Sequence, residues 1–409
     1  MMKGNHMETA ATVWTLTATA LVLFMTLPGL ALFYGGLVRQ KNFLSVLTQC
    51  FGITAVVSVV WMIAGYSFAA GNADQGAWFG GVSFVGLADQ GVWLDALFQM
   101  TFAIITPALI IGALVERVRF SFIIAFSALW VLLVYAPVMG WIWKGGALSA
   151  DGFGIFKGIG LQDLAGGVVV HETAGLAALV LALMLGARRG FPKAVRPPHQ
   201  PGLVMVGAAM LWVGWFGFNG GSASPIDGGS TRAILVTHLS ASAACITWAA
   251  WEYAKVGKVS LVGVVTGMVA GLASITPAAG HVGPLGALII GGIAGVVCQD
   301  CIGLVKTRFR IDDSLDVFAV HGVGGLLGTL ILPFLAAPWL GGTGLGGVSV
   351  GEQFMVQLVG VLIVGIFTLV GTFLIAALCR SICGMRLDDE AIEDGADYAS
   401  HGESAYDLS

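Results

Sequence analysis

The chain has 409 residues, of which 57% are hydrophobic and only 10% are charged, with a formal net charge of −4. Soluble domains usually carry about 25% charged residues, so a chain this apolar cannot cover its surface with polar side chains. Its composition excludes an ordinary soluble enzyme and a basic nucleic-acid-binding protein. It predicts an all-α polytopic membrane protein, with the length read as a number of transmembrane helices.

Eleven apolar stretches are each close to the roughly 20 residues that a helix needs to cross a bilayer. They cover residues 11–36, 44–69, 94–115, 120–141, 164–187, 202–220, 232–253, 259–277, 285–305, 316–337 and 353–382. The first stretch is long enough to span, and no short apolar segment with a small-residue cleavage site precedes it. We therefore expect it to be retained as a helix.

The basic residues divide unequally between alternate connections. Fifteen of the 19 lie in one set of connections, and the other set holds only Lys3, Lys144, Lys157 and Arg232. Positive charge marks the cytoplasmic side, so we expect the N-terminus outside and the C-terminus inside. Eight of the 23 acidic residues follow Leu387. The segment 383–409 is therefore predicted to be an acidic cytoplasmic tail.

Two pairs of similar segments lie five predicted spans apart. "VVVHETAGL" (168–176) resembles "FAVHGVGGL" (318–326), and "FYGG" (33–36) resembles "FNGG" (218–221). Because five is an odd number, the copies would cross the membrane in opposite directions, as in the inverted repeats of transporters. We predict a membrane domain over 1–382, with one repeat at about 11–187, a second at about 202–337 and an extra helix at about 353–382.

The first of these segments places a histidine and a glutamate, His171 and Glu172, inside an apolar span, where ionisable groups are costly and usually functional. A zinc-protease HExxH motif would need a second histidine at position 175, which is Gly175, so we expect no metal site. The repeat pairs His171 with His321, although a hydrogen-bonded core role remains an alternative. Glu172 lies about 100° around the helix from His171, so we expect it at a helix–helix contact, hydrogen-bonded or protonated.

Several other polar and aromatic residues have more than one possible role when the sequence is considered alone. Asp163 precedes the fifth span and could cap the free N–H groups at its start. Trp143 could belong to an interfacial aromatic belt or could attract a cation. Phe102 and Phe218 could simply pack. The CxxC of Cys298 and Cys301 has no second cysteine pair, so we interpret it as structural.

Five stretches together strongly resemble the ammonium transporter and Rhesus family, on its microbial ammonium transporter branch. They are "TFAIITPALIIGALVERVRFS" (101–121), "DLAGGVVVHETAGL" (163–176), "LWVGWFGFNGGSA" (211–223), "GLASITPAAG" (271–280) and "DVFAVHGVGG" (316–325). The resemblance covers nearly the whole chain. It implies eleven spans, a five-plus-five inverted repeat, and a homotrimer with one pore per subunit in the plasma (inner) membrane. No cofactor is implied.

The resemblance also implies roles for residues at the outer end of the pore. Trp143, Phe102 and Ser222 would bind ammonium, with methylammonium as an expected analogue. Phe102 and Phe218 would stack below that site as a gate. An intramembrane hydrolase using Ser222 is disfavoured, because no nucleophile motif surrounds that serine.

Deeper in the pore, the resemblance places His171 and His321 along the lumen, with Asp163 and Trp215 supporting the site. It implies an ammonium transporter that deprotonates NH4+, conducts NH3 and passes the proton along the two histidines. The alternatives are an electroneutral NH3 channel and an ammonium receptor in which transport is incidental. The tail resembles the segment that couples subunits and meets PII-type nitrogen-signalling proteins.

Overall fold

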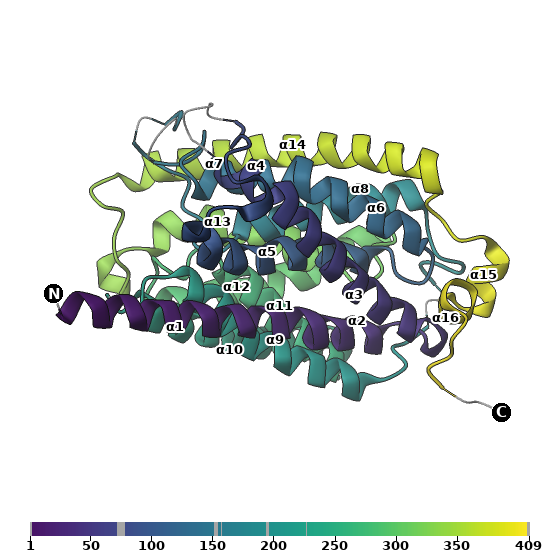
Figure 1. The fold of residues 1–409 in the computed structure, drawn as a ribbon. Helices are drawn as coiled ribbons and strands as arrows, with labels where there is room; N and C mark the ends of the chain where they lie inside the picture. The colour runs from purple at the N-terminus through teal and green to yellow at the C-terminus, as the bar shows by residue number, and fades with distance from the viewer. Residues whose placement is uncertain are drawn as a thin grey trace.

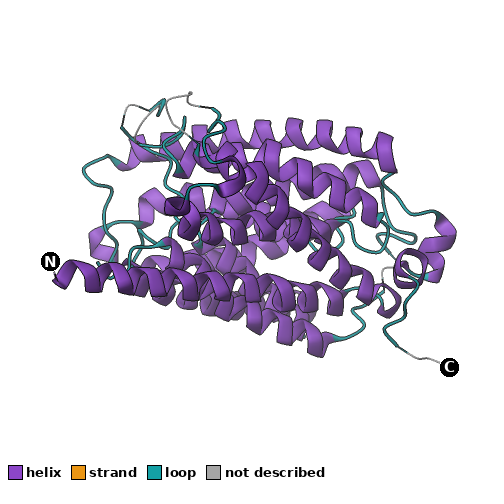
Figure 2. Ribbon diagram, in the orientation of Figure 1, coloured by secondary structure: helices purple, strands orange, loops and turns teal. Residues whose placement is uncertain are grey.

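The computed structural model describes residues 2–71, 78–150, 154–156, 158–193, 196–225 and 227–406, with side chains from residue 8 onward. Throughout these ranges the regular secondary structure is helical (Figure 2). The only β feature among them is an isolated antiparallel bridge between Val118 and Arg386. Lys157, the side chain of Lys3 and the tail residues from 407 onward lie outside the description.

The helices of the first half include several that continue through π-helical turns. They are α1 (Met2–Phe24), η1 (Met25–Leu30), α2 (Ala31–Leu37), η2 (Gln40–Asn42), α3 (Phe43–Val60), η3 (Trp61–Gly65), α4 (Tyr66–Ala70), η5 (Val85–Leu87), η6 (Gln90–Val92), α5 (Trp93–Ile110), η7 (Ile111–Ala113), α6 (Phe120–Trp130), η8 (Val131–Tyr135), α7 (Ala136–Trp143), η9 (Gly167–Glu172) and α8 (Thr173–Leu185).

The second half and the tail are built in the same way. Their elements are α9 (Pro201–Ser222), α10 (Gly229–Val256), α11 (Leu261–Ile275), α12 (Pro284–Gly303), η10 (Leu304–Arg308), η11 (Phe318–Gly322), α13 (Val323–Leu335), η12 (Pro338–Leu340), α14 (Val350–Cys383), α15 (Asp389–Asp394) and α16 (Ala396–His401).

The prediction of an all-α polytopic membrane protein is confirmed: ten helical segments of the described chain are long and apolar enough to cross a bilayer. The exception is α11, which occupies the predicted span 259–277 but has only 15 residues. An eleventh crossing there remains a prediction. It is favoured by the two termini, which lie at opposite ends of the bundle (Figure 1), as an odd number of crossings requires.

The bundle carries apolar side chains on its outside as well as in its core. Ile246, Ile366 and Ile382 are 69%, 63% and 74% exposed. In water such a surface would be an association or aggregation site, whereas in a bilayer it is matched by the lipid chains. The outer surface is therefore suited to lipid, or to further copies of the chain.

The pairs η9–α8 and η11–α13 cross at the centre of the bundle. Gly167 lies against Gly325, whereas Gly175 lies against Gly322, so the two pairs run in opposite directions. The long helix α14 packs against α6, α8 and α13 along one side (Figure 1). It therefore lies beside the central crossing and outside the pair of helices that forms it.

An ionic cluster joins several loops at the end of the bundle that carries the C-terminus. Arg188 pairs with Asp312 at 2.8 Å and with Glu116 at 3.5 Å, and Arg39 also pairs with Glu116 at 3.1 Å. Burial alone would raise the pKa of Glu116, but the two arginines and their hydrogen bonds hold it below its ordinary value. These loops are therefore held together as one unit.

The tail is attached to the same end of the bundle through α16. The Asp397 carboxylate accepts hydrogen bonds from the backbone N–H groups of Leu44 and Ser45, at 3.1 and 2.7 Å. These are free N–H groups in the first turn of α3, so Asp397 caps that helix from a distant part of the chain. The tail thus contacts the turn that connects α2 to α3.

Candidate conduction pathway

The two predicted histidines meet at the centre of the bundle. His171 Nδ1 and His321 Nδ1 are 3.2 Å apart, and the two rings lie 24° from parallel. The side chains are only 1% and 4% exposed. A neutral imidazole has one donor and one acceptor nitrogen, so this contact requires one Nδ1 to carry the proton and the other to accept it.

The close contact depends on how the two helix pairs cross. Each histidine lies in a π-helical segment, η9 or η11, a local widening of the helix that is frequent at functional sites. Gly175 presses on the backbone of η11 at Gly322, and Gly325 presses on the backbone of η9 at Gly167. A Cβ atom at Gly175 or Gly325 would overlap the opposite backbone. The glycines therefore allow the imidazoles to come within hydrogen-bonding distance.

Asp163 organises the start of η9. Its carboxylate accepts four backbone hydrogen bonds, from Gly166 (2.9 Å), Gly167 (2.6 Å), Val168 (2.9 Å) and Val169 (3.0 Å). These are the N–H groups that the first helical turn leaves without intrahelical partners, and the negative charge also suits the positive end of the helix dipole. The carboxylate thereby orients the segment that carries His171.

Asp313 does the same for η11, and sequence reasoning missed it. Its carboxylate accepts from Val317 at 3.0 Å and from Phe318 at 2.7 Å. Burial raises the pKa of this carboxyl to about 6. Asp163 and Asp313 each stand eight residues before their histidine, at the same 150-residue offset as the histidines themselves. Extending the repeat alignment by a few residues would have found Asp313.

Two stacked phenyl rings close the pathway beside His171. Phe102 and Phe218 have ring centroids 4.3 Å apart with a 25° angle between the rings, and both side chains are buried. The Phe218 ring lies 6.0 Å from His171. Trp215 stacks on the same imidazole at 5.4 Å, lies 5.4 Å from the Phe218 ring, and donates its indole N–H to Thr276 Oγ1 at 2.9 Å. His171 is therefore in contact with two aromatic rings that also contact each other.

A cavity of about 410 Å³, the Trp143 cavity, lies beyond the phenyl pair toward the end of the bundle that carries the N-terminus; it is lined in part by Trp143, Ser222, Phe98, Asp95 and Gln99. Trp143 donates its indole N–H to the Asp163 carbonyl at 2.7 Å, which fixes the ring. Ser222 donates to the Phe218 carbonyl at 2.9 Å, so its hydroxyl oxygen keeps lone pairs to accept a hydrogen bond.

Phe102 does not line this cavity itself. It lies edge-on to Trp143, with centroids 5.9 Å apart, and is 1% exposed. The ring that joins Trp143 and Ser222 at the cavity is Phe98, which sequence reasoning missed. Phe98 is one helical turn before Phe102, and that i, i+4 spacing on a pore helix was the available signal. The predicted site residues are thus near one another, with Phe102 one layer deeper.

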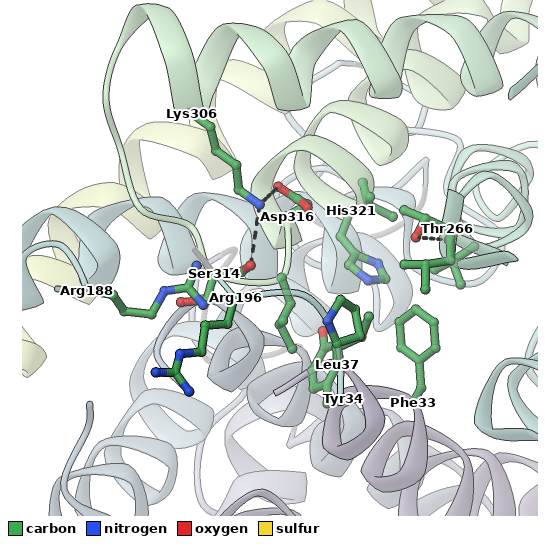
Figure 3. Close-up of a pocket in the computed structure, with 15 residues that line it drawn as sticks. Phe33, Tyr34, Leu37, Arg188, Arg196, Thr266, Lys306, Ser314, Asp316 and His321 are labelled. Carbon is green, nitrogen blue, oxygen red and sulfur yellow. Dashed lines mark hydrogen bonds and ion pairs between the residues drawn. The ribbon is translucent and has the colours of Figure 1, made fainter. Parts of the chain in front are cut away.

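A second cavity, the Asp316 cavity, lies on the far side of the histidines. It has a volume of about 210 Å³, and Figure 3 shows His321 at its border together with Asp316, Lys306 and Arg188. Lys306 Nζ pairs with Asp316 Oδ1 at 2.6 Å. The pathway therefore runs from the Trp143 cavity, past two phenyl rings and two imidazoles, to a charged cavity toward the end that carries the C-terminus.

Known proteins resemble this chain over nearly its whole length. The sequence model of the Ammonium Transporter Family matches residues 13–406. The chain belongs to the ammonium transporter family. Its relatives include an ammonium transporter of Aquifex aeolicus, 42% identical over 98% of this chain and 94% of the relative, and one of Bacillus subtilis, 39% identical over 98% and 99%.

Solved structures of the family have the same fold. A sensor Amt protein superposes with a TM-score of 0.89 at 28% identity, covering 97% of this chain and 100% of its own. Mep2 of Saccharomyces cerevisiae gives 0.82 at 32% identity, covering 93% and 88%. The relatives are named as transporters, so the family assignment rules against the hydrolase interpretation of Ser222, and the chain is not classed as an enzyme.

Glu172 lines neither of the two cavities. The side chain is 1% exposed and its Oε1 lies close to Gly365 of α14, where an added Cβ would come within 3.1 Å of that oxygen. Its Oε2 has no hydrogen-bond partner among the described residues. The predicted helix–helix contact is present. Of the two predicted states, hydrogen-bonded or protonated, the protonated one stays the prediction for Oε2.

The described residues contain no cluster of three or more histidine, cysteine, aspartate or glutamate side chains that could hold a metal ion. Cys298 is buried and Cys301 half-buried, and neither forms a disulfide.

Proposed function

We propose that the protein is an electrogenic ammonium transporter. NH4+ is recruited at the Trp143 cavity and deprotonated, NH3 passes the phenyl pair and the histidines, and the proton travels separately along His171 and His321. The observation that carries this proposal is the order of groups along the pathway: a cavity with polar groups, an apolar constriction, and a buried pair of hydrogen-bonded imidazoles.

Recruitment rests on three groups around the Trp143 cavity. Trp143 and Phe98 offer ring faces that attract a cation, and tryptophan has the strongest such face. Ser222 offers an oxygen that can accept a hydrogen bond from ammonium. Asp95 adds a carboxylate at the same cavity, although it is already paired with Lys144 at 2.6 Å. Together these groups suit a small cation that can donate hydrogen bonds, and methylammonium as its analogue.

Selectivity follows from the constriction. A bare cation at the centre of a membrane is expensive. Ammonium can shed a proton and continue as neutral NH3, whereas potassium is similar in size and has no proton to lose. The gate formed by Phe102 and Phe218 would therefore pass neutral NH3 and exclude potassium.

The proton needs its own route because the lumen beyond the gate is apolar. Each neutral imidazole has a donor and an acceptor nitrogen, so a proton added at one ring can be released at the other. The Nδ1–Nδ1 contact supplies the link between the rings. Net charge then moves with each ammonium taken up, while Asp163 and Trp215 hold the site in position.

Orientation and partners complete the proposal. The basic loops lie at the C-terminal end of the bundle, which we assign to the cytoplasmic side of the plasma (inner) membrane, with the N-terminus outside. We propose a homotrimer with one pore per subunit. The ordered tail offers a surface for a PII-type nitrogen-signalling protein at the cytoplasmic face.

The test is a current measurement on purified protein in liposomes on a solid-supported membrane. Ammonium and methylammonium should give inward currents, and potassium should give none above protein-free liposomes. His171→Ala/His321→Ala should lose proton-coupled current and potassium exclusion. Full uptake with unchanged current and selectivity in that double variant would contradict the relay.

Two other functions remain in competition. An electroneutral NH3 channel would take up methylammonium with no current in the wild type, so the same experiment separates it. A receptor role is favoured by the structural similarity to a sensor Amt protein. Unaltered nitrogen signalling in a non-conducting Phe218 variant would support the receptor and would leave transport incidental.

A further inference from the structure

Asp316 lies where the pathway opens toward the C-terminal end of the bundle. It borders the Asp316 cavity together with His321, and its carboxylate is paired with Lys306 (Figure 3). About a fifth of each paired side chain is exposed, 21% for Asp316 and 24% for Lys306. Bulk water occupies about 30 Å³ per molecule, so a cavity of about 210 Å³ can hold several waters between the imidazole and the carboxylate.

The backbone at Asp316 is strained in a way that its counterpart is not. Asp316 has φ of 64°, in the left-handed region that favours glycine. The position 150 residues earlier is Gly166, which also has a positive φ, of 111°. Both halves therefore need a left-handed residue before the histidine segment. One half uses glycine, whereas the other keeps an aspartate at an energetic cost.

Strain of this kind persists where the side chain is needed, and it collects at functional sites. Four non-glycine residues of the described chain have positive φ: Leu87, Glu116, Arg310 and Asp316. Of these, Asp316 is the one that borders the conduction pathway. Its carboxylate is therefore retained at a position where glycine would fit the backbone better.

We propose that Asp316 is the proton acceptor on the exit side of the histidine pair. This rests on the proposed function, because it requires a proton to travel separately from NH3. The His321 imidazolium gives up a ring proton, which crosses the cavity water and joins a carboxylate oxygen of Asp316. The resulting carboxylic acid gives the proton to NH3 leaving the lumen, which forms NH4+ and restores the carboxylate.

The surroundings of Asp316 suit a carboxylate that accepts a proton only briefly. Burial raises the pKa of Asp316, and the nearby Lys306 ammonium opposes that rise. Lys306 therefore keeps the group ionised between transport cycles, while burial makes it a better base than a carboxylate in water. The same cavity is bordered by Arg188 and Arg196. Together with Lys306 they disfavour a cation in the cavity, so the NH4+ formed there is expelled.

Other charged groups lie beside this site. Arg188 carries its own partners, Asp312 and Glu116, and Asp313 is engaged with the backbone of η11. Asp312, Glu116 and Asp313 do not line the Asp316 cavity, whereas Asp316 lines it together with His321.

The test compares three variants by ammonium-induced current in liposomes. Asp316→Asn keeps the size and tolerates the left-handed backbone, but it cannot take up a proton. Asp316→Gly relieves the backbone strain and leaves a hole beside Lys306. We expect both to lower the current at least about tenfold. Removing a general base typically lowers a rate by about a hundredfold or more. The matched control, Arg310→Gly, relieves the same kind of strain away from the cavity and should keep the wild-type current.

Formate distinguishes proton transfer from a structural role of the ion pair. In Asp316→Gly, formate can occupy the hole beside the Lys306 ammonium and act as the missing carboxylate, so added formate should restore a large part of the current. It should change neither the wild type nor protein-free liposomes. Thermal unfolding of Asp316→Gly should occur at or above the wild-type temperature.

The outcomes separate this inference from the proposed function. A wild type that transports without current would remove the proposed electrogenic function itself. Wild-type current that persists in Asp316→Asn and Asp316→Gly would overturn the role of Asp316 alone. Loss of current in Asp316→Gly that formate does not restore would also overturn it, in favour of a structural ion pair.

Discussion

The two histidine segments of the molecule, residues 163–176 and 313–326, can be compared position by position because their histidines are 150 residues apart. Both begin with a capping aspartate, Asp163 or Asp313, and both place the histidine in a π-helical turn. Both carry a glycine four residues after the histidine, Gly175 or Gly325. The shared positions are the ones that build the crossing and bring the imidazoles together.

Two of the positions that differ carry a carboxylic acid in one half and a glycine in the other. Gly166 corresponds to Asp316, and Glu172 corresponds to Gly322. The first difference places a carboxylate at one mouth of the pathway only. The second places Glu172 against Gly365 of α14, whereas Gly322 lies against Gly175 at the crossing. The comparison thus separates residues that make the shared geometry from residues that serve one side.

The largest effect should come from removing the capping aspartates. Asp163 accepts four backbone N–H groups and Asp313 accepts two. Each buried donor left without a partner costs about 1 kcal/mol or more. Asp163→Ala should therefore destabilise the protein by about 4 kcal/mol and Asp313→Ala by about 2 kcal/mol. Unfolding of the purified variants in detergent would measure both losses in stability. Equal losses would mean that the two aspartates contribute equally, whatever the number of N–H groups that each accepts.

The next effect should come from the glycine contacts. Gly175→Ala would place a Cβ into the backbone at Gly322, so the two helix pairs must move apart. We expect a loss of about 3 kcal/mol in stability, the upper range for overpacking, because the obstacle is backbone and cannot rotate away. The Nδ1–Nδ1 contact should lengthen and transport should fall with it.

A matched control is Gly351→Ala in the first turn of α14, where nothing lies within 4 Å of an added Cβ. That variant should retain its transport and its stability, since alanine favours a helix more than glycine does. Wild-type transport in Gly175→Ala would show that the histidine pair does not depend on the close crossing.

Much of the fold is predictable from hydropathy alone, because apolar length sets where a chain can cross a bilayer. The short helix α11 and the π-helical turns are harder. A π turn has no residue pattern of its own and arises where packing against other helices fixes the backbone. Pro28 lies inside one such turn, but the turns that carry His171 and His321 contain no proline.

The candidate site was predictable as far as the repeat could be followed. The similarity of residues 168–176 to residues 318–326 paired the two histidines. The same 150-residue offset also relates Asp163 to Asp313, which was missed. Phe98 was missed because its one signal, the i, i+4 spacing from Phe102, is also common among residues that simply pack on an apolar helix. The left-handed φ of Asp316 has no signal in its own loop, and the sequence offers only an indirect one, the glycine at the corresponding position 166.

The smallest effect is expected at Glu172, the position where α14 breaks the symmetry. Ionisable residues inside a membrane protein are usually functional, but Glu172 faces Gly365 rather than either cavity, and its Oε2 has no partner among the described residues. A buried carboxyl in that state costs stability and is best accommodated as the neutral acid.

Glu172→Gln should therefore leave stability nearly unchanged, and Glu172→Leu, which removes the unpartnered group at similar volume, should raise it by up to about 1 kcal/mol. Ammonium-induced current should stay within about twofold of the wild type in both, well short of the roughly hundredfold or larger loss typical of a proton-transfer residue. A tenfold loss of current in Glu172→Gln with an unchanged unfolding midpoint would instead identify Glu172 as a proton carrier. The asymmetry between the two halves would then be functional at Glu172 as well as at Asp316.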